Sequence, residues 1–114
     1  MGFSGQYLTY NEYRSMGGTL DLTPFNMLEF KARREIDQET QGRLVNLKEH
    51  KNETKMCVFE LINLFISINN GVETSGNVIN YNSKEIAKTK SDIIMKYLLY
   101  VRLDDGTPYL YRGI

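Results

Sequence analysis

The stretch 56–68 is apolar on nearly every side, and it constrains the fold more than any other part of the sequence. Within it, Glu60 carries the one charge and Asn63 the one side-chain amide. A helix that is apolar all round must be surrounded by other elements. The stretch is too short to cross a bilayer, which takes about 20 apolar residues. We therefore expect a central helix from about Asn52 to the stop signal Asn69-Asn70-Gly71. It is covered either by the rest of a small bundle or in part by a neighbouring subunit.

Composition allows one domain and points to no charged partner. The chain has 114 residues, enough for a single core. Fourteen Lys and Arg residues balance fourteen Asp and Glu residues, so net charge gives no indication of nucleic acid or anionic membrane as a partner. The single cysteine, Cys57, is expected to be a small buried hydrophobe rather than a reactive thiol. Residues 1–5 lack the features of a secretion signal, so we expect synthesis in a cytoplasm and no membrane partner.

Two helices are predicted from end signals in the first part of the chain. Thr9 and Glu12 have the spacing of a capping box, in which each side chain satisfies the backbone N–H of the other residue. Gly17-Gly18 then ends the first helix, because glycine accepts the left-handed conformation of a helix end. The second helix is expected to begin at Thr23-Pro24, with the threonine as N-cap, and to run to Asp37.

The second helix has two apolar faces with different expected partners. At about 100° per residue, one stripe should face the core; its members are Phe25, Leu28, Ala32 and Ile36. Met27, Phe30 and Arg34 lie on the opposite side. Either another segment of the same chain covers this opposite face or a neighbouring subunit does. These three residues are therefore candidate interface residues.

The second half of the chain is predicted to hold a loop, a helix and a turn. Residues 72–82 combine strand-forming residues with the turn signal Ser75-Gly76-Asn77, which predicts an extended loop. A fourth helix is expected from Ser83, with Ile86, Ile93, Tyr97 and Val101 as its core stripe. Asp104-Asp105-Gly106 predicts a simple turn, since the further acidic ligands of a calcium loop do not follow.

These elements predict a mainly α protein, a small four-helix bundle-like domain over residues 1–103 with an extended C-terminal tail over 104–114. The tail contains an apolar, aromatic run whose backbone groups and side chains need a partner. We expect the tail to dock on another protein chain, through Tyr109, Leu110, Tyr111, Arg112 and Ile114. The alternative is that it folds back on the helical core of its own chain.

No pattern in the sequence indicates catalysis, a cofactor or a metal site. The sequence has neither the phosphate-binding glycine loop nor the ligand spacing of a zinc site, and no Ser/His/Asp set has a plausible base. His50, the single histidine, lies among Lys48, Glu49 and Lys51 and is expected to be a solvated loop residue. We expect a protein that is not an enzyme and binds no cofactor.

Several segments, in their order along the chain, together resemble one family. They are residues 7–13 with 16–18, residues 25–37 with 42–44, and the closing run Leu110-Tyr111-Arg112-Gly113-Ile114. They resemble the N-terminus, the second helix and the closing Leu-Tyr-Arg-Gly motif of small head–tail connector proteins of long-tailed bacteriophages. Residues 73–81 are loosely similar to the Ser-rich turn of that family. Residues 104–108 depart from its pattern as an insertion before the closing motif.

The resemblance implies a mainly helical adaptor for head completion. Such a protein forms a closed ring, expected here as a dodecamer, below the portal protein and extends the DNA channel. It meets the next head-completion or tail-connector protein and contacts passing DNA without sequence specificity. The expected location is the virion, at the head–tail interface, after synthesis in the host bacterial cytoplasm. A small helical DNA-binding regulator is the alternative, although it would need a basic recognition helix. A small enzyme is a third function class.

Overall fold

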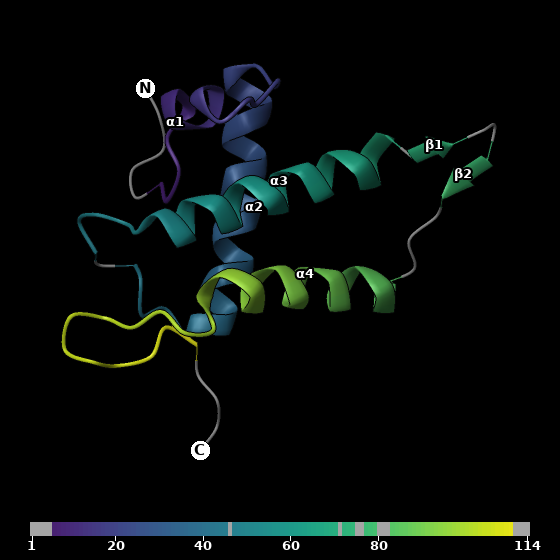
Figure 1. Ribbon diagram of the computed structural model, residues 1–114. Coiled ribbons are helices and arrows are strands. Elements are labelled where there is room, and N and C mark those ends of the chain that lie inside the picture. The colour runs from purple at the N-terminus through teal and green to yellow at the C-terminus, as the bar shows by residue number, and fades with distance from the viewer. Residues whose placement is uncertain (1–5, 46, 71, 75–76, 80–82, 111–114) are drawn as a thin grey trace.

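The computed structural model describes residues 6–45, 47–70, 72–74, 77–79 and 83–110 (Figure 1). Within these ranges, four helices and one two-stranded sheet form, in the order α1 (Tyr10–Ser15), α2 (Leu22–Thr40), α3 (Asn52–Asn70), β1 (Val72–Thr74), β2 (Asn77–Ile79) and α4 (Ser83–Leu98). The strands β1 and β2 pair antiparallel, with Val72 opposite Ile79. The expectation of a mainly α, bundle-like fold is confirmed.

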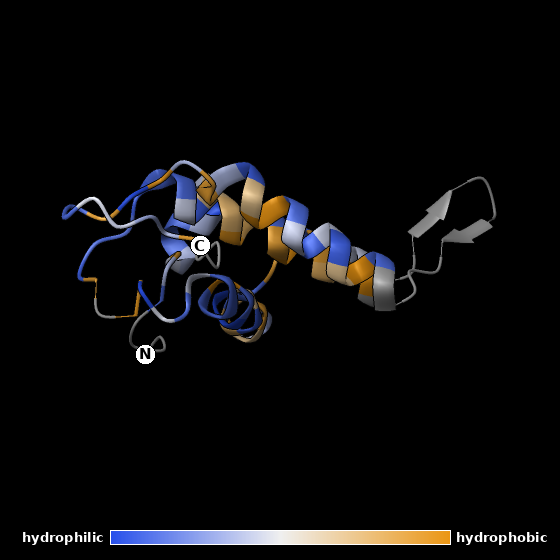
Figure 2. Cartoon of the chain, turned by 90° about the horizontal axis from the view of Figure 1, so that it is seen from below, coloured by the Kyte–Doolittle hydropathy of each residue, from blue (hydrophilic) through white to orange (hydrophobic). Residues whose placement is uncertain are grey.

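The helices are arranged as a pair and a crossing helix. α3 and α4 lie side by side and antiparallel, and α2 crosses them at a steep angle with α1 at its N-terminal end (Figure 1). Seen from below, α2 appears almost end-on beside the layer of α3 and α4 (Figure 2). In the described residues, no helix is long and apolar enough to cross a membrane.

One hydrophobic core joins all four helices and the segments at both ends. Its buried members are Tyr7, Leu8, Tyr13, Phe25, Leu28, Ala32, Ile36, Leu44, Cys57, Val58, Leu61, Ile62, Ile94, Leu98, Tyr109 and Leu110. The expected core stripe of α2 is therefore confirmed. α3 is enclosed along the side that carries Cys57, Leu61 and Ile62, whereas Met56 is 44% exposed and Phe65 is half-buried. One chain thus covers this apolar helix incompletely.

The expected stripe of α4 lies at the edge of the core, not at its centre. Ile94 and Leu98 are buried, while Ile93 and Tyr97 are partly exposed. Each buried residue directly follows one that was expected in the core, while Ile93, Tyr97 and Val101 still pack against the edge of the core, so the helix is rotated by less than one residue step from the expected orientation. Ile86 and Val101, the other two members of that stripe, are also half-buried.

The capping box of α1 is confirmed. The Glu12 backbone N–H donates to Thr9 Oγ1 over 3.2 Å, and the Thr9 backbone N–H donates to Glu12 Oε1 over 3.0 Å. At the other end, Gly17 has φ +98°, the left-handed conformation expected of a helix stop. Both ends of this helix are therefore set by local chemistry that the sequence displays.

The expected start of α2 at Thr23 is wrong. The helix begins at Leu22, Asp21 is the N-cap residue without a side-chain hydrogen bond, and Pro24 lies inside the first turn. The backbone that leads into α2 is fixed by a residue of α1, because the Tyr13 hydroxyl accepts the backbone N–H of Leu20 over 3.1 Å. At its other end, α2 runs past Asp37 to Thr40 and closes on Gln41, which has φ 52°.

The segment after α4 forms a tight hairpin that returns to the core. Arg102 and Pro108 form an antiparallel bridge, and the Leu103 N–H donates to the Thr107 carbonyl over 2.7 Å. The expected turn is present at its tip, where Gly106 has φ +91°. The backbone N–H of Tyr109 donates to the Val101 carbonyl over 2.9 Å, which brings Tyr109 and Leu110 back to the helices.

The expectation that Tyr109 and Leu110 dock on another subunit is wrong. Tyr109 is 1% exposed and Leu110 is 4% exposed, and both belong to the core of their own chain. The hairpin reverses the chain, so these side chains find their apolar partner locally. The other expected tail contacts, Tyr111, Arg112 and Ile114, lie outside the described residues.

Candidate functional site

The outer side of α2 is the predicted interface that stays exposed. Met27 is 59% exposed and Phe30 is 47% exposed, and Arg34 is exposed as well. We call these three residues the outer α2 face. The guanidinium of Arg33 lies 5.3 Å from the centroid of the Phe30 ring. Met27 and Phe30 thus remain exposed in the fold of the single chain.

The outer α2 face continues into a groove between three helices. The groove has a volume of about 390 Å³ and is lined by Lys31, Arg34, Glu35, Gln38, Phe65, Ile68, Ile86 and Lys90. We call it the basic groove, because its rim carries three cationic side chains against one carboxylate. Lys90 Nζ lies 2.5 Å from Glu35 Oε1, so this ion pair joins α4 to α2 across the groove. The floor is apolar and comes from α3 and α4.

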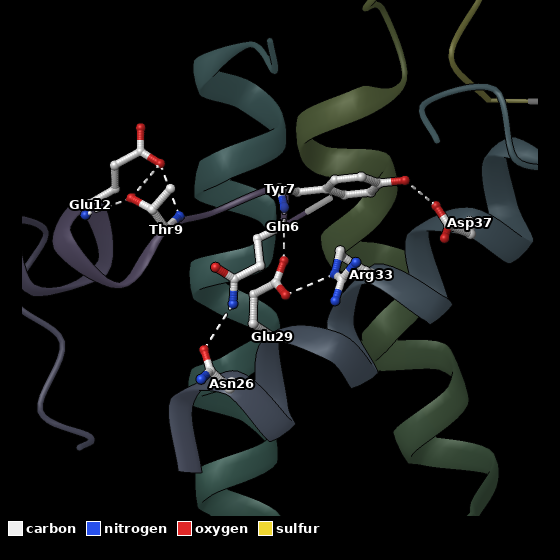
Figure 3. A network of polar contacts seen from close by, with 8 residues as sticks. All are labelled: Gln6, Tyr7, Thr9, Glu12, Asn26, Glu29, Arg33 and Asp37. Carbon is white, nitrogen blue, oxygen red and sulfur yellow. Dashed lines mark hydrogen bonds and ion pairs between the residues drawn. The ribbon is translucent and has the colours of Figure 1, made fainter. Parts of the chain in front are cut away.

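A polar network fastens the N-terminal segment to α2 (Figure 3). The Tyr7 backbone N–H donates to Glu29 Oε2 over 2.9 Å, and Arg33 Nε donates to Glu29 Oε1 over 2.8 Å. The Tyr7 hydroxyl donates to Asp37 Oδ1 over 2.5 Å, and the Gln6 amide donates to Asn26 Oδ1 over 2.9 Å. These contacts span one side of α2 from Asn26 in its second turn to Asp37 in its last, so we interpret the network as a structural latch.

Glu29 is the central group of this latch. Its side chain is fully buried, and burial raises the pKa of its carboxyl group, against the opposing effects of Arg33 and of backbone N–H donors. A buried carboxylate with an ion-pair partner and backbone donors holds two segments together. Its oxygens point to groups of the same chain, not to a cavity (Figure 3).

His50 and Cys57, the single histidine and the single cysteine of the chain, both pack within the fold. The expectation that His50 is solvated is wrong, because its ring is half-buried with its centroid 4.3 Å from that of Tyr7. Burial lowers the pKa of His50. The expectation that Cys57 is a buried hydrophobe is confirmed, since it is 0% exposed. No group of three His, Cys, Asp or Glu residues within the described ranges could hold a metal ion.

A polar contact between α3 and α4 allows a test by pH. Glu60 Oε1 accepts hydrogen bonds from the Tyr97 hydroxyl over 2.5 Å and from Lys96 Nζ over 3.0 Å. Burial acts to raise the pKa of Glu60, but these hydrogen bonds outweigh it and hold the pKa below its usual value. A carboxyl group with a lowered folded-state pKa stabilises the fold above its usual pKa, and this contribution is lost as pH falls through the folded-state pKa.

We therefore expect the Glu60→Gln variant to lose less stability on acidification than the parent chain. The difference should appear between about pH 5 and pH 3 and stay under about 1 kcal/mol, because the contact is partly open to solvent. Urea unfolding followed by circular dichroism at a series of pH values measures it. Parallel pH profiles of the two proteins would show that Glu60 does not contribute in this way.

Comparison with known proteins gives a distant similarity. The chain matches no family model and no solved structure. It is 26% identical over 110 residues to aminoacyltransferase FemA of Staphylococcus epidermidis, with 91% of this chain aligned. FemA from two strains of that species gives the same match. The chain spans 26% of the length of FemA, so the similarity concerns a quarter of that protein.

The sequence predicted the outer α2 face but not the basic groove. It identified the three residues of the outer α2 face from helical periodicity. It could not identify the basic groove, because Phe65, Ile86 and Lys90 come from separate helices whose packing the sequence does not display. The lone signal was a pair of cationic residues, Lys31 and Arg34, three positions apart on one helix.

Proposed function

We propose that this chain is a structural adaptor of the head–tail connector of a long-tailed bacteriophage, without catalytic activity or cofactor. In this proposal it forms a closed ring, expected as a dodecamer, beneath the portal protein. The ring extends the DNA channel and presents a surface to the next head-completion or tail-connector protein. The protein is then part of the virion, at the interface of head and tail.

The observation that carries the proposal is how the segments that resemble the connector family pack together. The first of them is latched to α2 by Tyr7 and Glu29. Arg43, next to Leu44, donates from Nη1 to the Pro108 carbonyl over 2.9 Å. Leu44 and Leu110 share the same core. Segments from both ends of the sequence therefore form one continuous unit, as parts of a single inherited fold would.

The exposed apolar surface supports an assembling protein. Met27 and Phe30 are large apolar side chains that stay 59% and 47% exposed on the single chain. Met56 of α3 is exposed as well, although it belongs to the most apolar stretch of the sequence. A head-to-tail contact that closes into a ring would bury such surface without leaving an unpaired edge.

No specific observation favours the other two function classes, a DNA-binding regulator and a small enzyme. Zero net charge gives no support to a DNA-binding regulator. The similarity to FemA is 26% identity and covers a quarter of that protein. Contact with DNA, in the proposed function, is limited to passing DNA and has no sequence specificity.

A phage with a stop codon in this gene tests the proposal. Under restrictive conditions, it should accumulate DNA-filled heads and separate tails, visible by electron microscopy. Addition of the purified chain to the extract should restore infectious particles. Tailed, infectious particles made without the protein would contradict the proposed function.

Removing the apolar character of the outer α2 face should block assembly while the fold persists. We expect Met27→Ser with Phe30→Ser to lower incorporation into particles at least about tenfold, through loss of buried apolar area. The free energy of unfolding should change by less than about 0.5 kcal/mol per substitution, because both side chains are exposed.

The matched control places the same chemistry elsewhere on the surface. Leu22 and Val45 are 43% and 55% exposed, so Leu22→Ser with Val45→Ser removes similar exposed apolar area away from this face. Quantitative immunoblots of purified particles compare the two double variants. Equal incorporation of both would show that the outer α2 face is not an assembly contact.

A further inference from the structure

The positive charge and the small volume of the basic groove favour a narrow, acidic binding partner. Glu35 is engaged by Lys90 across the groove. Lys31 and Arg34 are both exposed on the rim, so the rim has an excess of positive charge over an apolar floor. A groove of this kind favours a projecting segment that carries carboxylates at its tip.

The hairpin after α4 is such a segment. Asp104 and Asp105 are exposed at its turn. The turn is held in one conformation, because the Gly106 N–H donates to the Leu103 carbonyl over 2.8 Å and the Thr107 N–H donates to Asp105 Oδ1 over 2.9 Å. An ordered tip loses little conformational freedom when it docks. The base of the hairpin is fastened in the core through Tyr109.

The groove and the tip lie toward opposite ends of the molecule. The groove lies where the C-terminal half of α3 runs beside the N-terminal half of α4. The hairpin follows the C-terminal end of α4, on the other side of α2 (Figures 1 and 2). A chain therefore cannot place its own tip in its own groove. A contact between two different surfaces of identical chains is head-to-tail, the type that generates closed rings.

We propose that the acidic hairpin tip of one copy, Asp104 and Asp105, docks in the basic groove of the next copy, against Lys31 and Arg34. This inference rests on the proposed function in one respect, since it names the contact that would join neighbours in the ring. It is a statement about self-association and can be measured on the purified chain alone. The charges steer the copies and fix their order, and the apolar floor contributes the buried area.

Charge exchange between the two surfaces tests the contact. The groove variant is Lys31→Glu with Arg34→Glu. The tip variant is Asp104→Lys with Asp105→Asn, since asparagine keeps the oxygen that accepts the Thr107 N–H. Each variant alone should associate at least about tenfold more weakly than the parent chain, because like charges meet in the contact. Sedimentation velocity at rising protein concentration measures the association.

Mixing the two variants gives the decisive result. The lysine-bearing tip of one variant fits the acidic groove of the other, and the remaining acidic tip fits the remaining basic groove. An equimolar mixture should therefore recover association to within about threefold of the parent chain. As a control, Asp21→Asn with Glu39→Lys changes the net charge by the same amount as the tip variant, at exposed positions outside the tip and the groove lining, and should associate as the parent does.

A second measurement maps the contact directly. Arg34→Cys and Asp105→Cys chains, mixed under mild oxidation, should form a mixed disulfide dimer faster than either chain forms one alone. Cys57 is buried and does not compete. Failure of the mixture to recover association, or a parent chain that stays monomeric at about 1 mM, would overturn the inference.

The outcomes separate this contact from the proposed function. If both charge variants still form rings and complement the phage extract, the tip–groove contact is wrong and the adaptor function stands. If the groove variant loses portal binding while the tip variant behaves as the parent chain, the occupant is the portal protein, and the inference is likewise overturned. If the phage assembles tailed particles without the gene, the adaptor function itself is wrong.

Discussion

Replacing Tyr109 with alanine is expected to lower the free energy of unfolding by about 3–5 kcal/mol, the usual cost of removing a fully buried aromatic side chain. Tyr109 is 1% exposed and belongs to the core that joins the helices. Its loss leaves a cavity under the hairpin and also frees Leu110, which is 4% exposed. Chemical unfolding of the purified variant, followed by circular dichroism, gives the change directly.

The control is the aromatic residue at the end of α4. Tyr100 is 91% exposed, so Tyr100→Ala should change the free energy of unfolding by less than about 0.5 kcal/mol. The pair also separates two views of the tail. A docking tail would make Tyr109→Ala harmless to the monomer and harmful to assembly. A tail that folds back on its own core makes the same substitution destabilising before any partner is present.

Replacing Gly18 with alanine is expected to cost about 3 kcal/mol, at the upper end of overpacking effects. A Cβ atom at this position would lie 2.2 Å from Cζ of Tyr13. The Tyr13 ring cannot yield easily, because it is fully buried and packs with its centroid 4.8 Å from that of Phe25. Its hydroxyl also accepts the backbone N–H of Thr19 over 3.1 Å, so a shift of the ring would break this contact.

The neighbouring glycine provides the contrast. Gly17 has φ +98°, and a Cβ atom added there would meet no other atom within 4 Å, so Gly17→Ala encounters backbone strain alone. That strain costs about 1 kcal/mol. Thermal or urea unfolding of the two alanine variants should therefore rank the stability of Gly18→Ala well below that of Gly17→Ala. Equal losses would show that the contact with Tyr13 relaxes at no cost.

The parts of the fold that the sequence predicted are those with local causes. The two ends of α1 follow from the capping box at Thr9 and from Gly17. The buried stripe of α2, from Phe25 to Ile36, follows from helical periodicity. The bounds of α3 follow from a long apolar stretch with polar ends. In each case, residues within one or two turns of a helix decide the outcome.

The parts that were wrong depend on contacts between distant segments. Asp21 replaces Thr23 as the N-cap because Tyr13 fixes the backbone that leads into α2. Ile94 and Leu98 face the core because α3 covers that side of α4, while their neighbours have equally apolar side chains. Tyr109 was correctly placed after a turn, but the sequence could not show that the turn brings it back onto its own helices.

The candidate site divides in the same way. The outer α2 face was predictable, since Met27, Phe30 and Arg34 lie on the side of the helix opposite its core stripe. The basic groove was not, because it exists only where α2, α3 and α4 meet. The acidic tip at Asp104 and Asp105 was recognised as a turn, but its rigid attachment to the core through Tyr109 is a property of the folded chain.

The burial of Cys57 makes its thiol a built-in probe of local unfolding around α3. The thiol is the single one in the chain, it is 0% exposed, and burial raises its pKa to about 12. A thiol reagent can therefore modify the chain only during excursions that expose α3, and the labelling rate reports how often they occur. Any contact that closes over α3 will slow the labelling, and the logarithm of the labelling rate will fall in proportion to the free energy that the contact adds, without an introduced probe.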